Sequence, residues 1–427
     1  MPLRRIASVT LTGLALAGLL SLGSAPAQAT TTQAAATQAT TAQSAGAAVA
    51  QSTDFYQLPS EYPATDGALI RQEPSAYYLD PLKLIGSNAQ VTRIMYKSTN
   101  SQGRPMAVTG TVLVPKTAWL GKGTRPLISL AAGTQGQGDQ CAPSKLMTMG
   151  SEYEGILLKG LLLRGYAVTI TDYEGLGTSD MHTYLSRLSQ GHAVLDAARA
   201  ALSLGIPGIN QSTRVGIAGY SQGGGAAASA AELASSYAPE LNLMGTYAGA
   251  VPADLQSVAS NIDGSLYTGF LLYAANGLLA SEGIDPSSYF NAQGLQSLQT
   301  AAQQCIFATL PSTAFLSTAK LTLSGQKFSA LTTSGTFKEI LNRQKLGVAG
   351  APKAPVLVGQ SLFDDVVPAA QAKALAKRWC AAGSTVQYAT TLLPTHVGGY
   401  AGLLPDLFAF MEARVAGLPA SSNCRSL

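Results

Sequence analysis

One serine of this chain lies in a sequence that can turn a hydroxyl group into a nucleophile. Gly219-Tyr-Ser-Gln-Gly223 is a GxSxG motif, and it occurs once in the 427 residues. It follows a short apolar run and precedes an Ala-rich stretch, which predicts a sharp turn from a strand into a helix. Glycines on both sides of Ser221 allow that turn without side-chain collisions. A glycine-rich loop without chemical function is the alternative interpretation, so the motif needs partners.

The partners of a serine nucleophile are a base within hydrogen-bond reach and a carboxylate that orients the base. In the fold that GxSxG indicates, the acid and then the histidine follow the serine, each after a strand. Asp364 follows the apolar run Val356–Gly359, and His396 follows Val386–Thr390. We therefore predict that Ser221, Asp364 and His396 catalyse acyl transfer.

Other residues compete for these roles. Asp365 is adjacent to Asp364, and we expect it to be exposed or to cap a helix. His192 lies inside a predicted helix, where a packing or surface role is expected. His182 follows a loop that could face the site. Both histidines precede the serine, which favours His396 as the base.

Acyl transfer also needs two hydrogen-bond donors for the oxyanion of the tetrahedral intermediate. The backbone N–H of Gln222, directly after the nucleophile, is the expected first donor. We expect the second at Gln135, in the loop after the strand that ends at Ala131. The glycines around Gln135 also fit an ordinary turn.

The composition excludes several other classes of protein. With 46% hydrophobic and 12% charged residues, the chain is too apolar for a disordered protein. The net charge of +4 comes without a dense basic stripe, so no nucleic-acid partner is expected. Its three histidines lack zinc-protease spacing, and the chain has neither a CxxC pair nor a phosphate loop. We expect no metal and no organic cofactor.

The N-terminus has the organisation of a secretory signal. Arg4 and Arg5 precede the apolar run Ile6–Leu22, and Ala27-Gln-Ala29 fits a cleavage site after Ala29. A membrane anchor is the alternative, but the run is short for a span, and no second run is long enough. Residues 1–29 are therefore predicted to be a signal peptide of a secreted protein without stable membrane insertion. The Thr/Ala/Gln-rich residues 30–53 predict a flexible leader.

The four cysteines are even in number, which in an exported protein favours two disulfides over free thiols. They are Cys141, Cys305, Cys380 and Cys424. Three pairings are possible, and the spacing alone does not select one.

Short apolar runs alternate with helical patterns over most of the chain, which predicts an α/β fold with a mostly parallel sheet covered by helices on both faces. Strands are expected at 126–131, 166–171, 214–218, 244–250, 354–359 and 386–390, and helices at 184–204, 224–235, 369–380 and 399–415. Between 252 and 351 the alternation stops and the pattern is mainly helical. We interpret 252–351 as a cap inserted into a core of 54–251 and 352–427, although ordinary core helices would give the same pattern.

With the three catalytic candidates placed, the chain resembles the secretory lipase family of α/β-hydrolases from about Asp54 to Cys424. Together these segments are specific for the family: Arg93–Thr99, Gly110–Pro115, Cys141–Ser144, Asp172–Gly175, Val194–Asp196, Gly219–Gly224, Ser236–Leu241 and Asp364–Pro368.

The resemblance implies roles for individual residues. It places the nucleophile at Ser221, the acid at Asp364 through the pattern D-x-x-V-P, and the base at His396. It implies that Cys141 pairs with Cys305, and Cys380 with Cys424. Gln135 stands where a fungal member has an oxyanion-hole aspartate; a backbone donor survives that difference, whereas a side-chain role of the acid does not.

The sequence therefore predicts an exported serine ester hydrolase of the lipase/esterase type, with an acyl ester or lipid as substrate and possible contact with a lipid–water interface through the cap. Short-chain or polyester esterases, acyltransferases and peptidases share the chemistry and remain alternatives. A non-catalytic binding protein of the same fold is the alternative from another class, although a binder has no need of Ser, Asp and His in this order.

Overall fold

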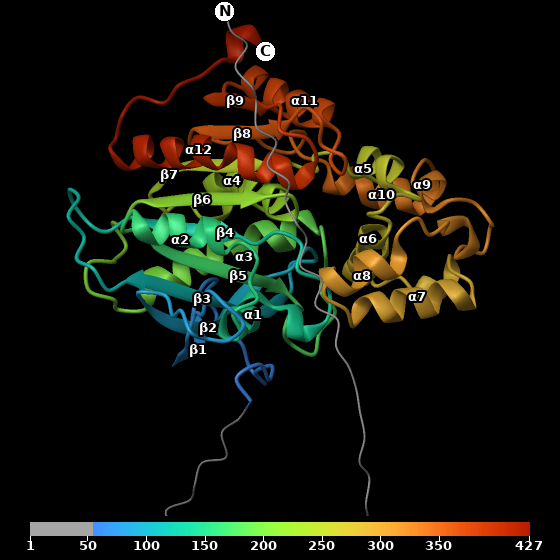
Figure 1. Cartoon of the computed structure of the whole chain (residues 1–427), viewed down its shortest axis with the longest axis horizontal. Helices are drawn as coiled ribbons and strands as arrows, with labels where there is room; N and C mark the ends of the chain where they lie inside the picture. The colour runs from blue at the N-terminus through green and yellow to red at the C-terminus, as the bar shows by residue number, and fades with distance from the viewer. Residues whose placement is uncertain (1–53) are drawn as a thin grey trace, which may run out of the picture. The chain divides into compact units, whose positions relative to one another are not determined.

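The structure, a computed structural model, describes residues 54–427, so the predicted signal peptide and leader lie outside the described residues. A nine-stranded sheet in the order β1-β2-β3-β5-β4-β6-β7-β8-β9 forms its centre. Figure 1 shows these strands stacked from β1 at the bottom to β9 at the top. The strands are β1 (Leu69–Pro74), β2 (Ala89–Thr99), β3 (Pro105–Pro115), β4 (Leu127–Ala131), β5 (Ala167–Glu174), β6 (Val215–Tyr220), β7 (Leu243–Gly249), β8 (Val356–Ser361) and β9 (Val386–Thr391).

The sheet is mostly parallel, as the alternating pattern predicts. Neighbouring strands in the order β5-β4-β6-β7-β8-β9 pair in parallel. The strands β1, β2 and β3 pair antiparallel with one another, and β3 pairs antiparallel with β5. Every residue of β4, β6 and β8 is buried, as expected for central strands covered on both faces.

Helices cover both faces of the sheet. On one face α2 (Gly155–Leu163) packs against α12 (His396–Val415), and on the other α3 (Arg187–Ser203) packs along α4 (Gln222–Tyr237). The helix α11 (Ala369–Ala381) is joined to α4 where Trp379 Nε1 donates to Glu232 Oε1 at 2.9 Å. A shorter helix, α1 (Pro143–Met149), precedes α2.

The segment between β7 and β8 is helical, and Figure 1 shows it to the right of the sheet, beside the ends of the strands. Most of its buried apolar side chains form, together with Tyr184, Val366 and Val367, a cluster separate from the core around the sheet. We call this segment, residues 252–351, the helical insertion. Its α-helices are α5 (Leu255–Ile262), α6 (Gly269–Glu282), α7 (Ala292–Ala302), α8 (Ile306–Thr313), α9 (Phe328–Leu331) and α10 (Gly335–Gln344).

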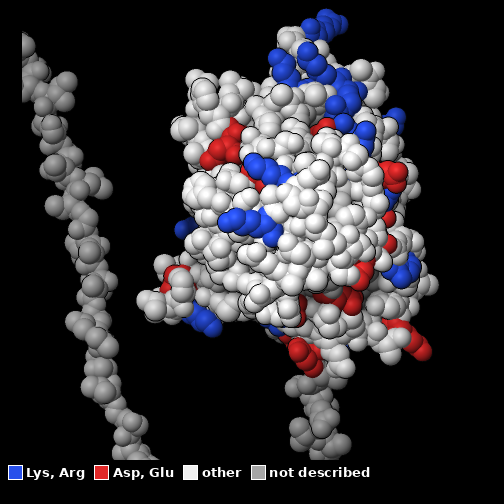
Figure 2. Space-filling view, turned by 90° about the vertical axis from the view of Figure 1, so that its right-hand side faces the viewer, with Lys and Arg blue, Asp and Glu red and all other residues white. Residues whose placement is uncertain are grey.

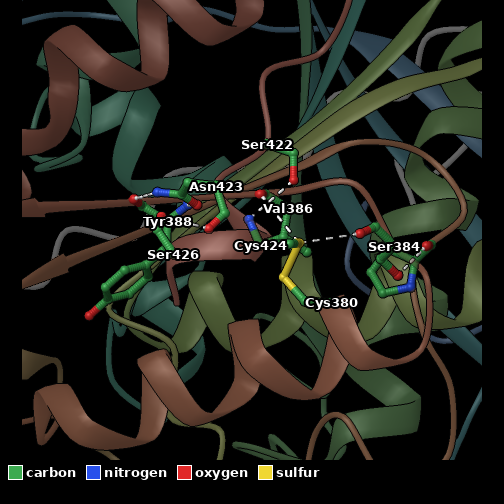
Figure 3. The surroundings of a disulfide bond; sticks show 9 residues. Cys380, Ser384, Val386, Tyr388, Ser422, Asn423, Cys424 and Ser426 are labelled. Atoms are coloured by element: carbon green, nitrogen blue, oxygen red, sulfur yellow. Dashed lines mark hydrogen bonds between the residues drawn. A yellow bond between two sulfur atoms is a disulfide. The ribbon is translucent and has the colours of Figure 1, made fainter.

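Two disulfides connect distant parts of the described chain in the pairing that the family resemblance implies. Cys141, just before α1, bonds to Cys305, just before α8, and Cys380 of α11 bonds to Cys424 near the C-terminus. Figure 3 shows how the second one holds the chain end against β9: Tyr388 N donates to Asn423 Oδ1 at 2.9 Å, and Asn423 Nδ2 donates to Tyr388 O at 2.8 Å. Among residues 54–427, no helix is both long and apolar enough to cross a bilayer.

Candidate active site

Ser221 occupies the sharp turn between β6 and α4 that the motif predicts. Its backbone has φ 62° and ψ −123°, a left-handed conformation that is strained for a residue with a side chain. A Cβ on Gly219 would overlap the Gly223 carbonyl, and one on Gly223 would overlap the Ala131 carbonyl. The motif glycines are therefore required by close backbone approach, and Ser221 stands at the N-terminus of α4.

Asp364 and His396, which are far apart in the sequence, are hydrogen-bonded in the structure. His396 Nδ1 lies 2.9 Å from Asp364 Oδ2 and 3.0 Å from Oδ1. Burial alone would raise the pKa of Asp364, but His396 and the N–H groups of Val367 and Val366 lower it, and the net shift is downward. An ionised Asp364 fixes a proton on Nδ1 and leaves Nε2 as the basic nitrogen.

Nε2 of His396 is buried and has no hydrogen-bond partner within residues 54–427. The ring lies beside Tyr220, the residue before the nucleophile, with ring centroids 5.1 Å apart. Tyr220 Oη also donates to the His396 carbonyl at 2.8 Å. The basic nitrogen of His396 is thus held close to the turn that carries Ser221, but within residues 54–427 no hydrogen bond joins it to the Ser221 hydroxyl.

Asp365 is exposed, as expected, but it also positions His396. Its Oδ1 accepts from His396 N at 2.8 Å, and its Oδ2 accepts from Tyr267 Oη of the helical insertion at 2.9 Å. Thr395, the residue before His396, has φ 68°. Its side chain accepts a hydrogen bond from Gly398 N and thereby caps α12. The last helix consequently starts at His396, three residues before the predicted Gly399.

Neither rival histidine is hydrogen-bonded to Asp364 in the described part of the chain. His192 of α3 stacks on Tyr237, with ring centroids 3.8 Å apart. His182 is buried, its Nδ1 bonds to Glu174 O at 2.8 Å, and its Nε2 lies 3.3 Å from Nε2 of Gln222. Because Glu174 O can only accept, the proton is on Nδ1, and Nε2 accepts from the Gln222 amide. Burial lowers the pKa of His182 to about 4, so the ring is neutral and holds Gln222.

The two predicted oxyanion donors have backbone N–H groups available. Gln222 is the first residue of α4, and the N–H groups of a first helical turn have no partner within the helix. In residues 54–427 the N–H of Gln135 donates no hydrogen bond, although Gln135 is buried. Helix N-termini favour negative charge, which suits an oxyanion beside Gln222.

Sequence reasoning missed two acids behind the loop of Gln135. Glu152 and Glu154 are both buried. Glu152 Oε1 accepts from Gln135 Nε2 at 2.9 Å, and Glu154 Oε2 accepts from Gly133 N at 3.1 Å. The one sequence signal is that two acids lie two residues apart, in Glu152-Tyr-Glu154. Such a pair is usually exposed to solvent, so the signal does not indicate a buried role.

A cavity runs from Ser221 and Gln222 into the helical insertion. Apart from Ser221, Gln222 and Thr332, its lining is apolar or aromatic. Contributing side chains include Leu255, Val258, Phe270, Leu278, Phe328 and Phe337. Such a cavity suits a hydrocarbon chain attached to an ester at Ser221. Across the part of the chain that the structure describes, no three His, Cys, Asp or Glu side chains gather as a metal ion would require.

Comparison with known proteins identifies related lipases. The sequence model of the family described as "Secretory lipase" matches residues 141–423. Lipase A of Arthroderma benhamiae is 27% identical over 401 residues, which cover 89% of this chain and 83% of the relative. A probable inactive lipase of Mycobacterium tuberculosis is 28% identical over 380 residues, covering 86% and 83%. The secreted triacylglycerol lipase LIP3 of Malassezia restricta is 28% identical over 346 residues, covering 76% and 71%.

The solved structures include an X-ray structure of Candida antarctica lipase A in its closed state. It superposes with a TM-score of 0.75 at 22% identity and covers 87% of both chains. At this identity the likeness establishes the fold, which is that of the α/β-hydrolases.

Proposed function

Because this chain belongs to the secretory lipase family, it is a carboxylic ester hydrolase, and we propose that Ser221, His396 and Asp364 carry out its reaction. One relative is named as a probable inactive lipase, so the assignment of catalytic residues has to be argued from the residues of this chain. The observation that carries the proposal is His396: Asp364 binds its Nδ1, and its buried Nε2 is unbonded beside the Ser221 turn.

In the proposed mechanism His396 Nε2 accepts the Ser221 proton as Oγ attacks the ester carbonyl. The oxyanion accepts hydrogen bonds from the N–H groups of Gln222 and Gln135. His396 then protonates the leaving alcohol, and an acyl-enzyme remains on Ser221. Water activated by His396 releases the acid, while ionised Asp364 stabilises the imidazolium in each half-reaction.

The helical insertion is proposed to act as a cap whose cavity holds the acyl chain. The cavity begins at the nucleophile and lies among apolar side chains. Each buried CH₂ group contributes about 0.8 kcal/mol to transfer from water. A chain of several carbons would therefore bind in preference to acetate, and the substrate class is an acyl ester with an extended hydrocarbon chain, as in lipids.

We further propose that the protein is exported after cleavage near Ala29 and meets lipid at the surface around the site. Exposed apolar side chains occur next to the catalytic loops, including Phe363 and Val397, and on the helical insertion, including Phe307 and Phe315. Figure 2 views the side that carries the insertion, where an area without charged side chains lies beside two groups of Lys and Arg side chains. An uncharged, partly apolar surface suits contact with a lipid–water interface.

Hydrolysis of p-nitrophenyl esters from acetate to palmitate by wild type and Ser221→Ala tests the triad. We expect a loss of at least about 10⁴-fold with an unchanged thermal transition, because the nucleophile has no substitute. A folded Ser221→Ala variant with wild-type turnover would refute the assignment. If the wild type hydrolyses none of these esters, that result would instead favour a peptidase, a specialised ester substrate or a binding protein.

The acyl cavity is tested by Ala274→Trp, since Ala274 of α6 lines it. An indole there would fill the cavity, so we expect the palmitate-to-acetate ratio of kcat/KM to fall at least tenfold. Ala280→Trp is the matched control, because Ala280 is exposed on the same helix. Equal ratios in both variants would place the acyl chain elsewhere.

A further inference from the structure

We propose that Glu152 and Glu154 are positioning residues that hold the oxyanion loop, residues 132–137, in its catalytic shape, and that they do so only while the pair retains a proton. This inference rests on the proposed function, because it takes Gln135 as an oxyanion donor. The two acids are buried behind the loop and have no part in the proton transfers assigned to His396.

Three consecutive residues bind three consecutive residues of the loop. Glu154 Oε2 accepts from Gly133 N at 3.1 Å, Tyr153 Oη donates to Thr134 O at 3.0 Å, and Glu152 Oε1 accepts from Gln135 Nε2 at 2.9 Å. Loops in general are held more loosely than this. The segment 152–154 therefore fixes the position and orientation of Gln135, the loop residue that carries the second oxyanion donor.

The other side of the loop is fixed by the helical insertion. Ile306 N donates to Gln135 O at 2.8 Å, and Gln137 N donates to Gln304 O at 3.1 Å. With both sides held, the carbonyl and the side-chain N–H of Gln135 have partners, and its backbone N–H is left for the substrate. A donor must be held in place before the reaction to stabilise an oxyanion effectively.

The surroundings of the pair disfavour two negative charges. Burial raises the pKa of Glu152 and of Glu154, and the Glu152 charge raises that of Glu154 further. The titratable groups that face the pair are phenols: Tyr77 before β2, Tyr153 between the two acids, Tyr173 of β5 and Tyr400 of α12. All four are neutral, and among residues 54–427 no cation contributes to the pKa of either acid.

The hydrogen bonds indicate which acid keeps the proton. Both oxygens of Glu152 accept an N–H, from Gln135 Nε2 and from Glu154 N at 2.7 Å. Glu154 accepts one N–H, on Oε2. Because N–H donors stabilise the charged form, Glu152 ionises first and Glu154 stays protonated. When the pH rises enough to ionise both, repulsion between buried like charges would displace segment 152–154 and the loop bound to it.

The test compares kcat and KM for a p-nitrophenyl ester between pH 6 and 10 in wild type, Glu154→Gln and Glu154→Ala. Glutamine keeps an oxygen for Gly133 N–H and cannot ionise. We therefore expect kcat close to that of wild type at pH 6, and a decline of kcat at alkaline pH that occurs at least one pH unit higher than in wild type. Alanine removes the acceptor, so kcat should fall at least tenfold with KM changed less than threefold. The control Glu412→Gln removes an exposed acid paired with Arg164, and it should match wild type throughout.

Either of two results would overturn the inference: an alkaline decline of kcat in Glu154→Gln identical to that of wild type, or wild-type kcat in folded Glu154→Ala. If Glu154→Ala does not fold, the pH profile of Glu154→Gln still decides. Failure of the proposed function gives a different result, namely activity that survives Ser221→Ala. Thermal melts of each variant at the assay pH distinguish loss of fold from loss of kcat.

Discussion

The two halves of the candidate site both depend on buried carboxyl groups, but the pKa of Asp364 is shifted down whereas the pKa values of Glu152 and Glu154 are shifted up. In the acid–base half, Asp364 accepts hydrogen bonds from His396 Nδ1, Gln360 Nε2 and two backbone N–H groups, and its pKa is lowered. In the oxyanion half, Glu154 accepts one N–H beside a second acid, and its pKa is raised. Hydrogen bonds from His396 and from backbone N–H groups thus outweigh the effect of burial at Asp364, whereas the single N–H at Glu154 does not.

The largest effect expected from this comparison is that of Asp364→Asn. An amide could not stabilise the imidazolium and could hold His396 in the wrong tautomer, so kcat should fall about 10⁴-fold near neutral pH. Glu154→Gln, the same change of acid to amide in the oxyanion half, should leave kcat nearly intact at pH 6. Steady-state kinetics of both variants on one ester gives the contrast directly.

Asp365→Asn is the matched control for Asp364, because it changes the adjacent carboxylate. Asp365 accepts from His396 N and from Tyr267 Oη, and an amide oxygen can replace only one of these acceptors. The expected loss of kcat is about tenfold, the cost of one hydrogen bond to a charged group. Equal losses in Asp364→Asn and Asp365→Asn would contradict the assignment of the acid.

The acid–base half and the oxyanion half also differ in how far the sequence predicted them. Apolar runs identified β4 to β9 because buried parallel strands read as continuous hydrophobic segments. Ser221, Asp364 and His396 could then be placed at strand ends, where the structure has them. The antiparallel strands β1 to β3 were not predicted, since their polar and apolar residues are mixed without the strand–helix alternation.

The supports of the oxyanion half could not be predicted, because they depend on burial between segments distant in sequence. Glu152 and Glu154 follow Gly150 and Ser151, which is typical of an exposed turn. His182 appeared to be a rival base, whereas it is a neutral ring that binds Gln222. The roles of Glu152, Glu154 and His182 follow from their burial beside the site, which no local sequence pattern encodes.

Removing each disulfide in turn sharpens the comparison, because only one of them adjoins the oxyanion loop. The chain-entropy estimate gives about 5 kcal/mol for Cys141–Cys305 and about 4 kcal/mol for Cys380–Cys424, whose sequence separations are 164 and 44. We expect similar losses of unfolding free energy for the double alanine variants, measured in urea. In addition, Cys141→Ala/Cys305→Ala should lose kcat well below its melting temperature, because Cys305 adjoins the residues that bond Gln135 and Gln137.

Cys380→Ala/Cys424→Ala serves as the control, since its bond holds the chain end against β9 (Figure 3). It should keep wild-type kcat wherever it is folded. A fall of kcat in this variant equal to that in Cys141→Ala/Cys305→Ala would mean that activity follows global stability, and that the oxyanion loop has no separate dependence on its disulfide.

His182→Gln is expected to change the acid stability of the protein. The folded-state pKa of His182 is about 4, against about 6.5 in an unfolded chain. As the pH falls from 6.5 to 4, the unfolded chain takes up a proton that the folded protein does not, so stability falls by up to about 3 kcal/mol. Without His182 this part of the decline disappears, and unfolding free energies at pH 7 and pH 4 should lie closer together.

His192→Gln is the matched control for His182. Burial also lowers the pKa of His192, and its Nδ1 also bonds to a backbone carbonyl, that of Thr99, but His192 has no hydrogen bond to Gln222. Both variants should flatten the acid decline of stability. Only His182→Gln should also reduce kcat, by about tenfold, since it alone removes the acceptor of the Gln222 amide. Wild-type kcat in His182→Gln would mean that the first turn of α4 alone orients the Gln222 donor, so that the oxyanion half depends on its buried supports only at Gln135.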